Sequence, residues 1–219
     1  MTSGVRVKTT KTRALTEASL ARAVAELGAR DADLARVAAE YGTPSMWGRE
    51  PGFASLVRIM LGQQVSLAAA DAAYEKLLAA ASPLTPAGLL ALSDETLRRA
   101  GFSRQKIVYA RHLASLLESG ELDLGALDAL ADDEVRARLL KVKGVGPWTA
   151  EIYMLMVMRR PDAWPSGDLA LQIAAQELKG LTARPTPAEL DALAEPWRPL
   201  RAVAARLLWS HYLKRPRRA

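Results

Sequence analysis

Alanine and leucine dominate the apolar positions along the chain, and runs of β-branched residues are scarce. Both residues are strong helix formers, so the pattern of apolar and polar positions predicts an all-α protein. Helices are expected at residues 16–40, 53–61, 66–81, 86–91, 94–99, 103–119, 124–129, 132–140, 147–158, 168–179, 187–194 and 198–213.

Glycine and proline separate several of these helices. Gly42-Thr43-Pro44 follows the first helix, Ser82-Pro83 ends the third, and Arg160-Pro161 stops the helix over 147–158. Many short helices with tight connections are typical of a globular bundle and not of a coiled coil. The punctuation therefore predicts a helical protein of compact lobes.

Three parts are expected along the chain. They are a disordered basic tail at 1–15, a terminal helical lobe built from 16–52 together with 162–219, and a second helical lobe over 53–161. The second lobe would carry a helix–hairpin–helix at about 132–158. A cleft between the two lobes, near 161–167, is an ordinary place for an active site.

Charge and composition narrow the chemistry. Lysine and arginine number 30 against 24 acidic residues, a net charge of +6 that favours a polyanionic partner without requiring one. There is no cysteine, which excludes disulfides, thiolate zinc sites and iron–sulfur clusters. The two histidines, His112 and His211, lie far apart in the sequence, so no metal held by side chains is expected.

Targeting signals are not evident. The chain lacks an apolar stretch of about 18 residues, and its N-terminus MTSGVRVKTTKTR has no apolar signal core. We expect a cytoplasmic protein with no membrane contact.

A glycine hairpin stands between the helices predicted at 132–140 and 147–158. Gly144 and Gly146 permit a tight turn with exposed N–H groups, Pro147 suits a first helical turn, and Val145 is expected to point inward. Such a turn aims backbone donors at an anion such as a phosphate. It could equally be a plain connector between helices. DNA-backbone contacts are expected from Lys141, Lys143, Gly144, Val145, Gly146 and Thr149.

Asp168 follows Pro165-Ser166-Gly167 and precedes an apolar helix. An aspartate at that place is often only a helix cap. On bound DNA it has a second use, because breaking an N-glycosidic bond builds positive charge on the sugar. An alkylated purine already carries positive charge and needs little protonation to leave. One carboxylate that stabilises the sugar cation and orients water would then suffice.

Three motifs in order resemble a known family. They are Gly144-Val145-Gly146 with Asp168 about twenty residues later, the stretch Phe53–Ser66 (FASLVRIMLGQQVS), and Trp197–Ala202 with Trp209. Together, over about residues 50–213, they resemble the helix–hairpin–helix (HhH-GPD) DNA glycosylases, in the 3-methyladenine DNA glycosylase II (alkylpurine) branch. The resemblance implies two helical lobes with the active-site cleft between them.

The resemblance also assigns roles. It implies that Asp168 is the catalytic carboxylate and that Trp148 stands where lyase-competent relatives carry a nucleophilic lysine, so that no lyase step is expected. Gln63 and Gln64 occupy the strand-separating turn, either as the wedge or as amides that satisfy a buried turn. The base pocket is expected to include Trp148, Trp209, Trp47, Tyr153 and Trp164.

The remaining expectations concern partners and pocket shape. Double-stranded DNA containing alkylated bases is the expected partner, with no cofactor, no protein partner, a monomeric state, and at most a monovalent cation on the Lys141 and Lys143 carbonyls. Leu169 and Ile152 stand where aromatic residues would be expected, which implies a more open pocket. Only about fifty residues precede the resembling region, too few for the extra N-terminal α/β domain of the larger bacterial enzymes.

The sequence therefore predicts a monofunctional glycosylase that flips and releases alkylated bases, 3-methyladenine-like purines foremost, with 7-methylguanine and other methylated bases as further candidates. One alternative is a non-catalytic helix–hairpin–helix DNA-binding protein. Another is a glycosylase for a different lesion class, including a bifunctional glycosylase-lyase for oxidised bases.

Overall fold

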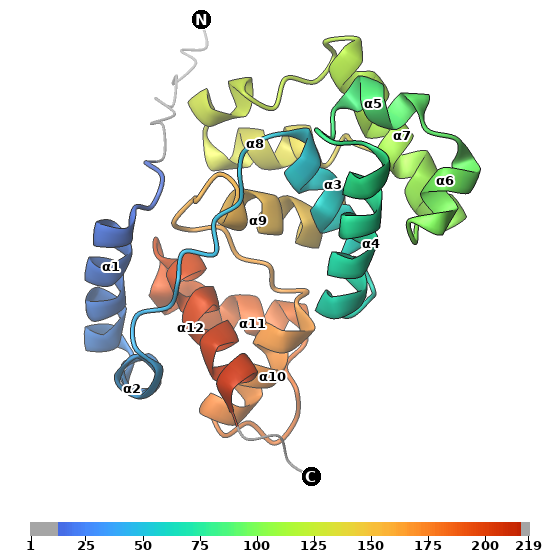
Figure 1. Cartoon of the computed structure of the whole chain (residues 1–219). Coiled ribbons are helices and arrows are strands. Elements are labelled where there is room, and N and C mark those ends of the chain that lie inside the picture. The colour runs from blue at the N-terminus through green and yellow to red at the C-terminus, as the bar shows by residue number, and fades with distance from the viewer. Residues whose placement is uncertain (1–12, 216–219) are drawn as a thin grey trace, which may run out of the picture.

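The structure is a computed structural model that describes residues 13–215. This part of the chain is helical and contains no strand (Figure 1). Its elements are α1 (Glu17–Arg30), α2 (Ala32–Tyr41), α3 (Phe53–Leu61), α4 (Leu67–Ala80), α5 (Pro86–Ala91), α6 (Asp94–Arg99), α7 (Arg104–Glu118), η1 (Ala126–Ala129), α8 (Asp132–Leu139), α9 (Pro147–Met156), α10 (Leu169–Leu178), α11 (Pro187–Ala194), η2 (Glu195–Trp197) and α12 (Arg201–Lys214).

The single helix expected at 16–40 is wrong, because the chain breaks at Asp31. Its backbone is extended, and its carboxylate accepts the N–H groups of Asp33 and Leu34 at 3.0 and 3.2 Å, which starts α2. Lys179 and the Trp197 indole also donate to that carboxylate, at distances of 2.7 to 2.8 Å. Burial acts to raise the pKa of Asp31, but these hydrogen bonds outweigh it and hold that pKa below its usual value.

The structure also differs from the helix predicted at 124–129. Residues 126–129 form a short 3-10 helix, η1. The Asp123 carboxylate accepts the N–H groups of Gly125 and Ala126 at 2.8 and 3.1 Å, so these donors close a local turn instead of opening an α-helix.

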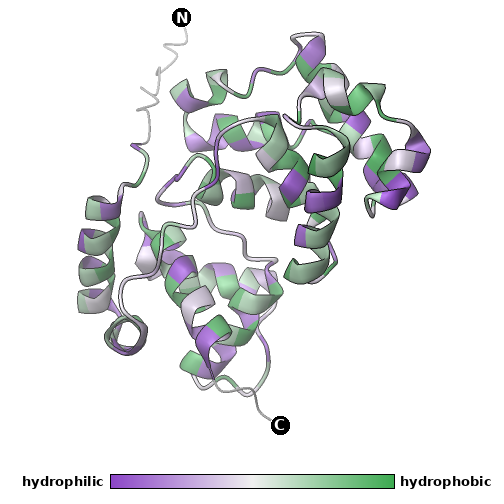
Figure 2. Ribbon diagram, in the orientation of Figure 1, coloured by the Kyte–Doolittle hydropathy of each residue, from purple (hydrophilic) through white to green (hydrophobic). Residues whose placement is uncertain are grey.

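The helices pack in two groups (Figure 1). One group joins α1, α2, α10, α11 and α12, and the other joins α3 to α9 around α3, α7 and α9. Most helices carry both hydrophobic and hydrophilic residues (Figure 2), but α12 is buried along most of its length. The segments 42–52 and 157–168 connect the two groups. The predicted domain boundaries remain a prediction.

The ends of the described chain are tied to the fold. Leu15 is buried and donates its N–H to the Arg159 carbonyl at 2.8 Å, so it belongs to the folded part and not to the expected tail. Lys214 donates to the Tyr41 carbonyl, and Arg215 pairs with Glu177. The rest of the two basic tails, 1–12 and 216–219, lies outside the described residues. None of the described helices has the length and apolar character needed to cross a membrane.

Candidate active site and nucleic-acid interface

Asp168 lies at the junction between the 157–168 segment and α10. Its N–H donates to the Pro165 carbonyl at 2.9 Å, which closes the turn that presents the side chain. One carboxylate oxygen, Oδ1, accepts the Leu171 N–H at 3.1 Å, so Asp168 does cap α10. The two interpretations of Asp168 are therefore compatible, because a capping carboxylate that is half-buried still has acceptor positions to spare.

Two tryptophans donate to this same carboxylate. The Trp148 indole N–H on α9 donates to Oδ2 at 2.9 Å, and the Trp209 indole N–H on α12 donates to Oδ1 at 3.1 Å. Trp148 and Trp209 lie 20 and 41 residues away from Asp168 along the chain. Three N–H donors fix the carboxyl group in one orientation, between the two helical groups.

A third tryptophan extends this cluster. Trp47 lies on the 42–52 segment, with its ring centroid 6.3 Å from that of Trp209 and the two planes tilted by 59°. Its φ of +43° is costly for a bulky side chain and needs support from its surroundings. The structure thus brings Trp148 and Trp209 to Asp168, and Trp47 to Trp209.

Arg206 supplies that support from inside the protein. It is fully buried on α12 and donates to the carbonyls of Met46 and, at 3.0 Å, of Leu155. Burial lowers its pKa to about 10. The guanidinium therefore ties the loop that carries Trp47 to α9 and α12 at once. Sequence reasoning missed this residue, because no motif marks a buried arginine.

Tyr153 and Trp164 are held by partners other than Asp168. Tyr153 is 1% exposed, and burial raises the pKa of its hydroxyl to about 12, although a hydrogen bond to the backbone of Gly52 acts in the opposite direction. Trp164 packs edge-on against Trp197, with ring centroids 5.6 Å apart, and its backbone N–H donates to Glu151 at 2.8 Å. Their expected place in the base pocket remains a prediction.

The hairpin has the geometry that the two glycines suggested. Gly144 has a φ of +87°, and a Cβ atom there would lie 2.3 Å from the Tyr109 ring. Val145 is buried, as expected, and its N–H closes the turn on the Val142 carbonyl at 2.9 Å. Gly146 precedes α9, whose N-terminus has no side-chain cap, so its first N–H groups lack a capping acceptor and could serve a ligand.

The other expected hairpin residues divide into two kinds. Lys141 and Lys143 are exposed and can reach an anion. Thr149 is only 2% exposed, and its hydroxyl accepts a hydrogen bond from the Gln63 side chain at 2.7 Å. Its side chain is therefore used inside the protein, and only its backbone N–H could serve a phosphate.

The two glutamines of the 62–66 turn also differ. Gln63 is half-buried, and its amide donates to the Gly144 carbonyl at 2.8 Å. Gln64 is exposed and has a φ of +57°, in the left-handed region. Only Gln64 is therefore free to reach a ligand without breaking a contact that holds the hairpin.

Exposed apolar side chains gather on the same segments. Val65 on the turn and Leu67 at the start of α4 are 46% and 70% exposed, Leu140 beside the hairpin is 42% exposed, and Leu169 next to Asp168 is 52% exposed. The turn, the hairpin and the carboxylate thus belong to three segments that all present side chains for contact.

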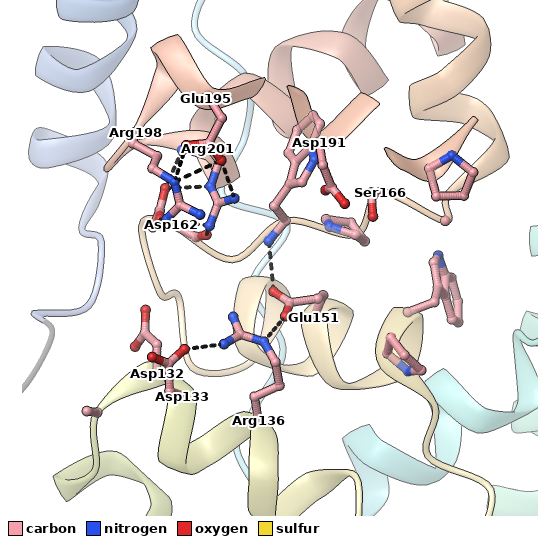
Figure 3. A pocket seen from close by; sticks show the side chains of 17 residues that line it. Asp132, Asp133, Arg136, Glu151, Asp162, Ser166, Asp191, Glu195, Arg198 and Arg201 are labelled. Atoms are coloured by element: carbon pink, nitrogen blue, oxygen red, sulfur yellow. Dashed lines mark hydrogen bonds and ion pairs between the residues drawn. The ribbon is translucent and has the colours of Figure 1, made fainter. Parts of the chain in front are cut away.

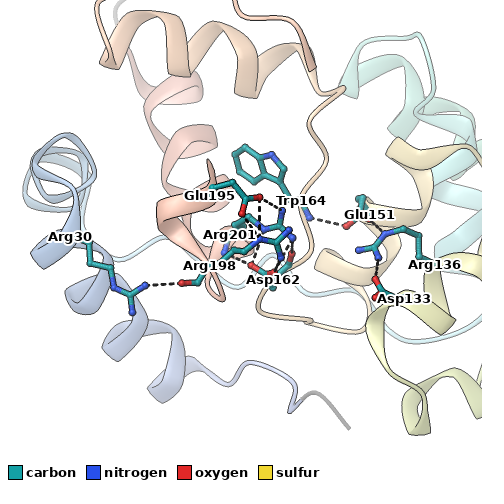
Figure 4. A network of polar contacts seen from close by, with 9 residues as sticks. All are labelled: Arg30, Asp133, Arg136, Glu151, Asp162, Trp164, Glu195, Arg198 and Arg201. Atoms are coloured by element: carbon teal, nitrogen blue, oxygen red, sulfur yellow. Dashed lines mark hydrogen bonds and ion pairs between the residues drawn. The ribbon is translucent and has the colours of Figure 1, made fainter. Parts of the chain in front are cut away.

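A cavity of about 920 Å³ adjoins the site, and its lining includes Trp148 and the 165–167 turn that precedes Asp168 (Figure 3). Its lining includes six carboxylate residues and three arginines, several of them paired. Arg136 bridges Asp133 and Glu151, while Arg198 and Arg201 share Asp162 (Figure 4). The excess of carboxylates disfavours a phosphate backbone, so we do not place DNA in this cavity.

The structure is a helical fold with a carboxylate held by two indole N–H groups between two groups of helices, and comparison with known proteins gives the family. Residues 57–199 match the HhH-GPD superfamily of base excision DNA repair proteins, so the chain belongs to that family. The predicted family and fold class are confirmed.

Individual relatives and solved structures have names that agree with this family. The alkylbase DNA glycosidase-like protein mag2 of Schizosaccharomyces pombe is 28% identical over 72% of this chain and 76% of its own. The S. pombe 3-methyladenine DNA glycosylase, solved in complex with abasic DNA, superposes with a TM-score of 0.80 at 26% identity, covering 86% of this chain and 95% of that one. The Bacillus halodurans DNA-3-methyladenine glycosidase superposes with a TM-score of 0.75 at 33% identity, covering 87% and 88%.

Proposed function

We propose that this protein is a monofunctional DNA glycosylase that hydrolyses the N-glycosidic bond of alkylated bases in double-stranded DNA and leaves an abasic site. The observation that carries the proposal is the Asp168 carboxylate, held by the indole N–H groups of Trp148 and Trp209. The substrates are 3-methyladenine-like purines, with 7-methylguanine and other methylated bases as further candidates. The names of the relatives support this class of substrate.

The chemistry follows from the charge on the damaged base. The target nucleotide must leave the helix before its glycosidic bond can be attacked. The C1′–N bond then breaks with its electron pair going to the cationic base, which departs neutral, and positive charge develops on the sugar. Asp168 stabilises that charge and orients a water, whose oxygen bonds to C1′ while its proton passes to solvent.

The indoles give selectivity for an alkylated base. A cationic ring over an aromatic face gains roughly 0.5–2 kcal/mol, depending on how well water is excluded. Trp148, Trp209 and Trp47 come from three different segments, so they can enclose an extruded base near Asp168. Trp148 offers no amine for a Schiff base, and the strand should remain intact.

The DNA backbone would lie across the hairpin. Its N–H groups, with Lys141 and Lys143, would hold phosphates, and a monovalent cation on the carbonyls of these two lysines remains a proposal. Gln64 is the proposed wedge that fills the space left by the extruded base. We propose a monomer that acts on the nucleoid of a bacterial cell.

Base release decides between the candidate functions. We expect the purified protein to free methylated purines from chemically methylated duplex DNA, with the strand cut only after alkali and no borohydride trapping. Binding with no release from any damaged duplex would favour a non-catalytic DNA-binding protein. Borohydride trapping on DNA would show a bifunctional lyase.

Trp148→Phe and Trp209→Phe each remove one N–H donor and keep an aromatic ring. Because hydrogen bonds to charged groups are worth about 1.5–3 kcal/mol, each variant should release base roughly 10- to 100-fold more slowly in single-turnover assays. Trp164→Phe is the matched control, since its buried indole N–H has no partner among the described residues. Equal losses in all three variants would contradict a role for the N–H groups.

A further inference from the structure

The side chain of Gln63 joins two turns that are far apart in the chain. Its amide nitrogen donates to the Gly144 carbonyl at 2.8 Å and to the Thr149 hydroxyl at 2.7 Å. The first contact spans 81 residues and the second 86. One side chain thus connects the 62–66 turn to both sides of the glycine hairpin.

The other end of that turn is held from α7. The Lys106 ammonium donates to the carbonyls of Leu61 and Gln63, at 2.6 and 3.0 Å, where α3 ends. Carbonyls at a helix C-terminus have no intrahelical partner, and a cation there satisfies them and opposes the helix dipole. Partial burial lowers the pKa of Lys106, because desolvation disfavours the charged ammonium.

The hairpin rests on the same helix. Tyr109 lies one turn after Lys106 on α7, and its ring occupies the space that a side chain at position 144 would need. One face of α7 therefore supports both turns, through Lys106 under the 62–66 turn and Tyr109 under Gly144. No motif in the sequence marks α7.

We propose that Gln63 is a positioning residue that locks the hairpin to the 62–66 turn, on a base formed by Lys106 and Tyr109. This inference rests on the proposed function and deepens it. Both acceptors of the Gln63 amide lie inside the protein, so Gln63 cannot fill a gap in DNA without losing them. Gln64 is exposed next to it and is left to act as the wedge.

The lock explains how phosphate binding and base extrusion are aligned. The hairpin would bind phosphates and the 62–66 turn would enter the DNA double helix, so the distance between hairpin and turn sets the position of the extruded sugar. Small displacements of reacting groups cost large factors in rate, because only a narrow range of geometries is productive. A fixed spacing should therefore favour both DNA affinity and the rate of base release.

Gln63→Met tests the lock, and Gln64→Met is the matched comparison at the adjacent residue. The assays are affinity for a duplex with an abasic-site analogue and single-turnover base release at saturating protein, with each of the four bases opposite the lesion. Gln63→Met should weaken both by about tenfold, since two hydrogen bonds are lost, and by the same factor for every opposite base. Gln64→Met should show a loss that depends on the opposite base.

The outcomes that overturn the inference are distinct. If the loss of affinity and rate in Gln63→Met varied with the opposite base, Gln63 would be a wedge. If Gln63→Met lost neither affinity nor rate, the two hydrogen bonds would have no positioning role. Gln63→Glu keeps the shape of the side chain and removes its amide donors. It replaces Gln63→Met if thermal melting shows that Gln63→Met folds poorly, and the same losses are expected.

A double-mutant cycle tests the contact itself. Thr149→Val removes one acceptor, so the double variant Gln63→Met/Thr149→Val should match Gln63→Met alone. If the loss of the double variant equalled the product of the two single losses, Gln63 and Thr149 would act independently and the lock would be overturned. DNA affinity can be measured without base release. A wild-type protein that binds abasic DNA and releases no base would overturn the proposed activity, while the double-mutant cycle on affinity would still test the lock.

Discussion

Asp168→Asn is expected to reduce base release by at least about a thousandfold, because a neutral amide cannot stabilise positive charge on the sugar. Asparagine has nearly the same shape and can still cap α10, so DNA affinity should change by no more than a few-fold. The measurement is single-turnover release of methylated purines, together with the affinity for abasic DNA.

Asp191→Asn is the control for this variant. Asp191 is an exposed carboxylate that lines the neighbouring cavity, and its loss should leave base release unchanged. Wild-type rates in Asp168→Asn would remove the catalytic role of Asp168. If Asp168→Asn instead lost DNA binding and thermal stability together, the carboxylate would be a cap and no more.

Gly144→Ala is expected to damage the hairpin, because two independent costs act at this position. The left-handed backbone costs a non-glycine residue about 1–3 kcal/mol, and a Cβ atom 2.3 Å from the Tyr109 ring forces further displacement. Together they should lower the free energy of unfolding by about 2–5 kcal/mol and weaken DNA binding.

Gly146→Ala separates these effects from a general intolerance of the turn. Gly146 has a φ of −91°, and a Cβ atom there meets nothing within 4 Å, so its stability should change by less than about 1 kcal/mol. Thermal melting of both variants checks the pair. Equal stability of the two variants would contradict the close approach of Tyr109 to Gly144.

Local patterns predicted much of the molecule. Most helices began and ended near their expected residues, because Ser, Thr, Pro and Gly act within one turn of the positions they occupy. The family was recognised because its hairpin and Asp168 are fixed by spacing along the chain. Both depend on neighbours in sequence, which a pattern can represent.

Long-range contacts could not be predicted in this way. The break at Asp31 is stabilised by Lys179 and Trp197, which lie 148 and 166 residues away. The resemblance implied that Trp148 and Trp209 line a pocket, but not that their indoles donate to Asp168. The separate uses of Gln63 and Gln64 likewise depend on where the hairpin lies in space.

The most direct test of the account is a crystal structure of this protein bound to duplex DNA that contains an abasic-site analogue. We predict phosphates on the Gly144–Gly146 N–H groups, Gln64 in the gap of the helix, and C1′ of the extruded sugar facing the Asp168 carboxylate. DNA bound across another face, or a sugar kept apart from Asp168 by the tryptophans, would contradict it.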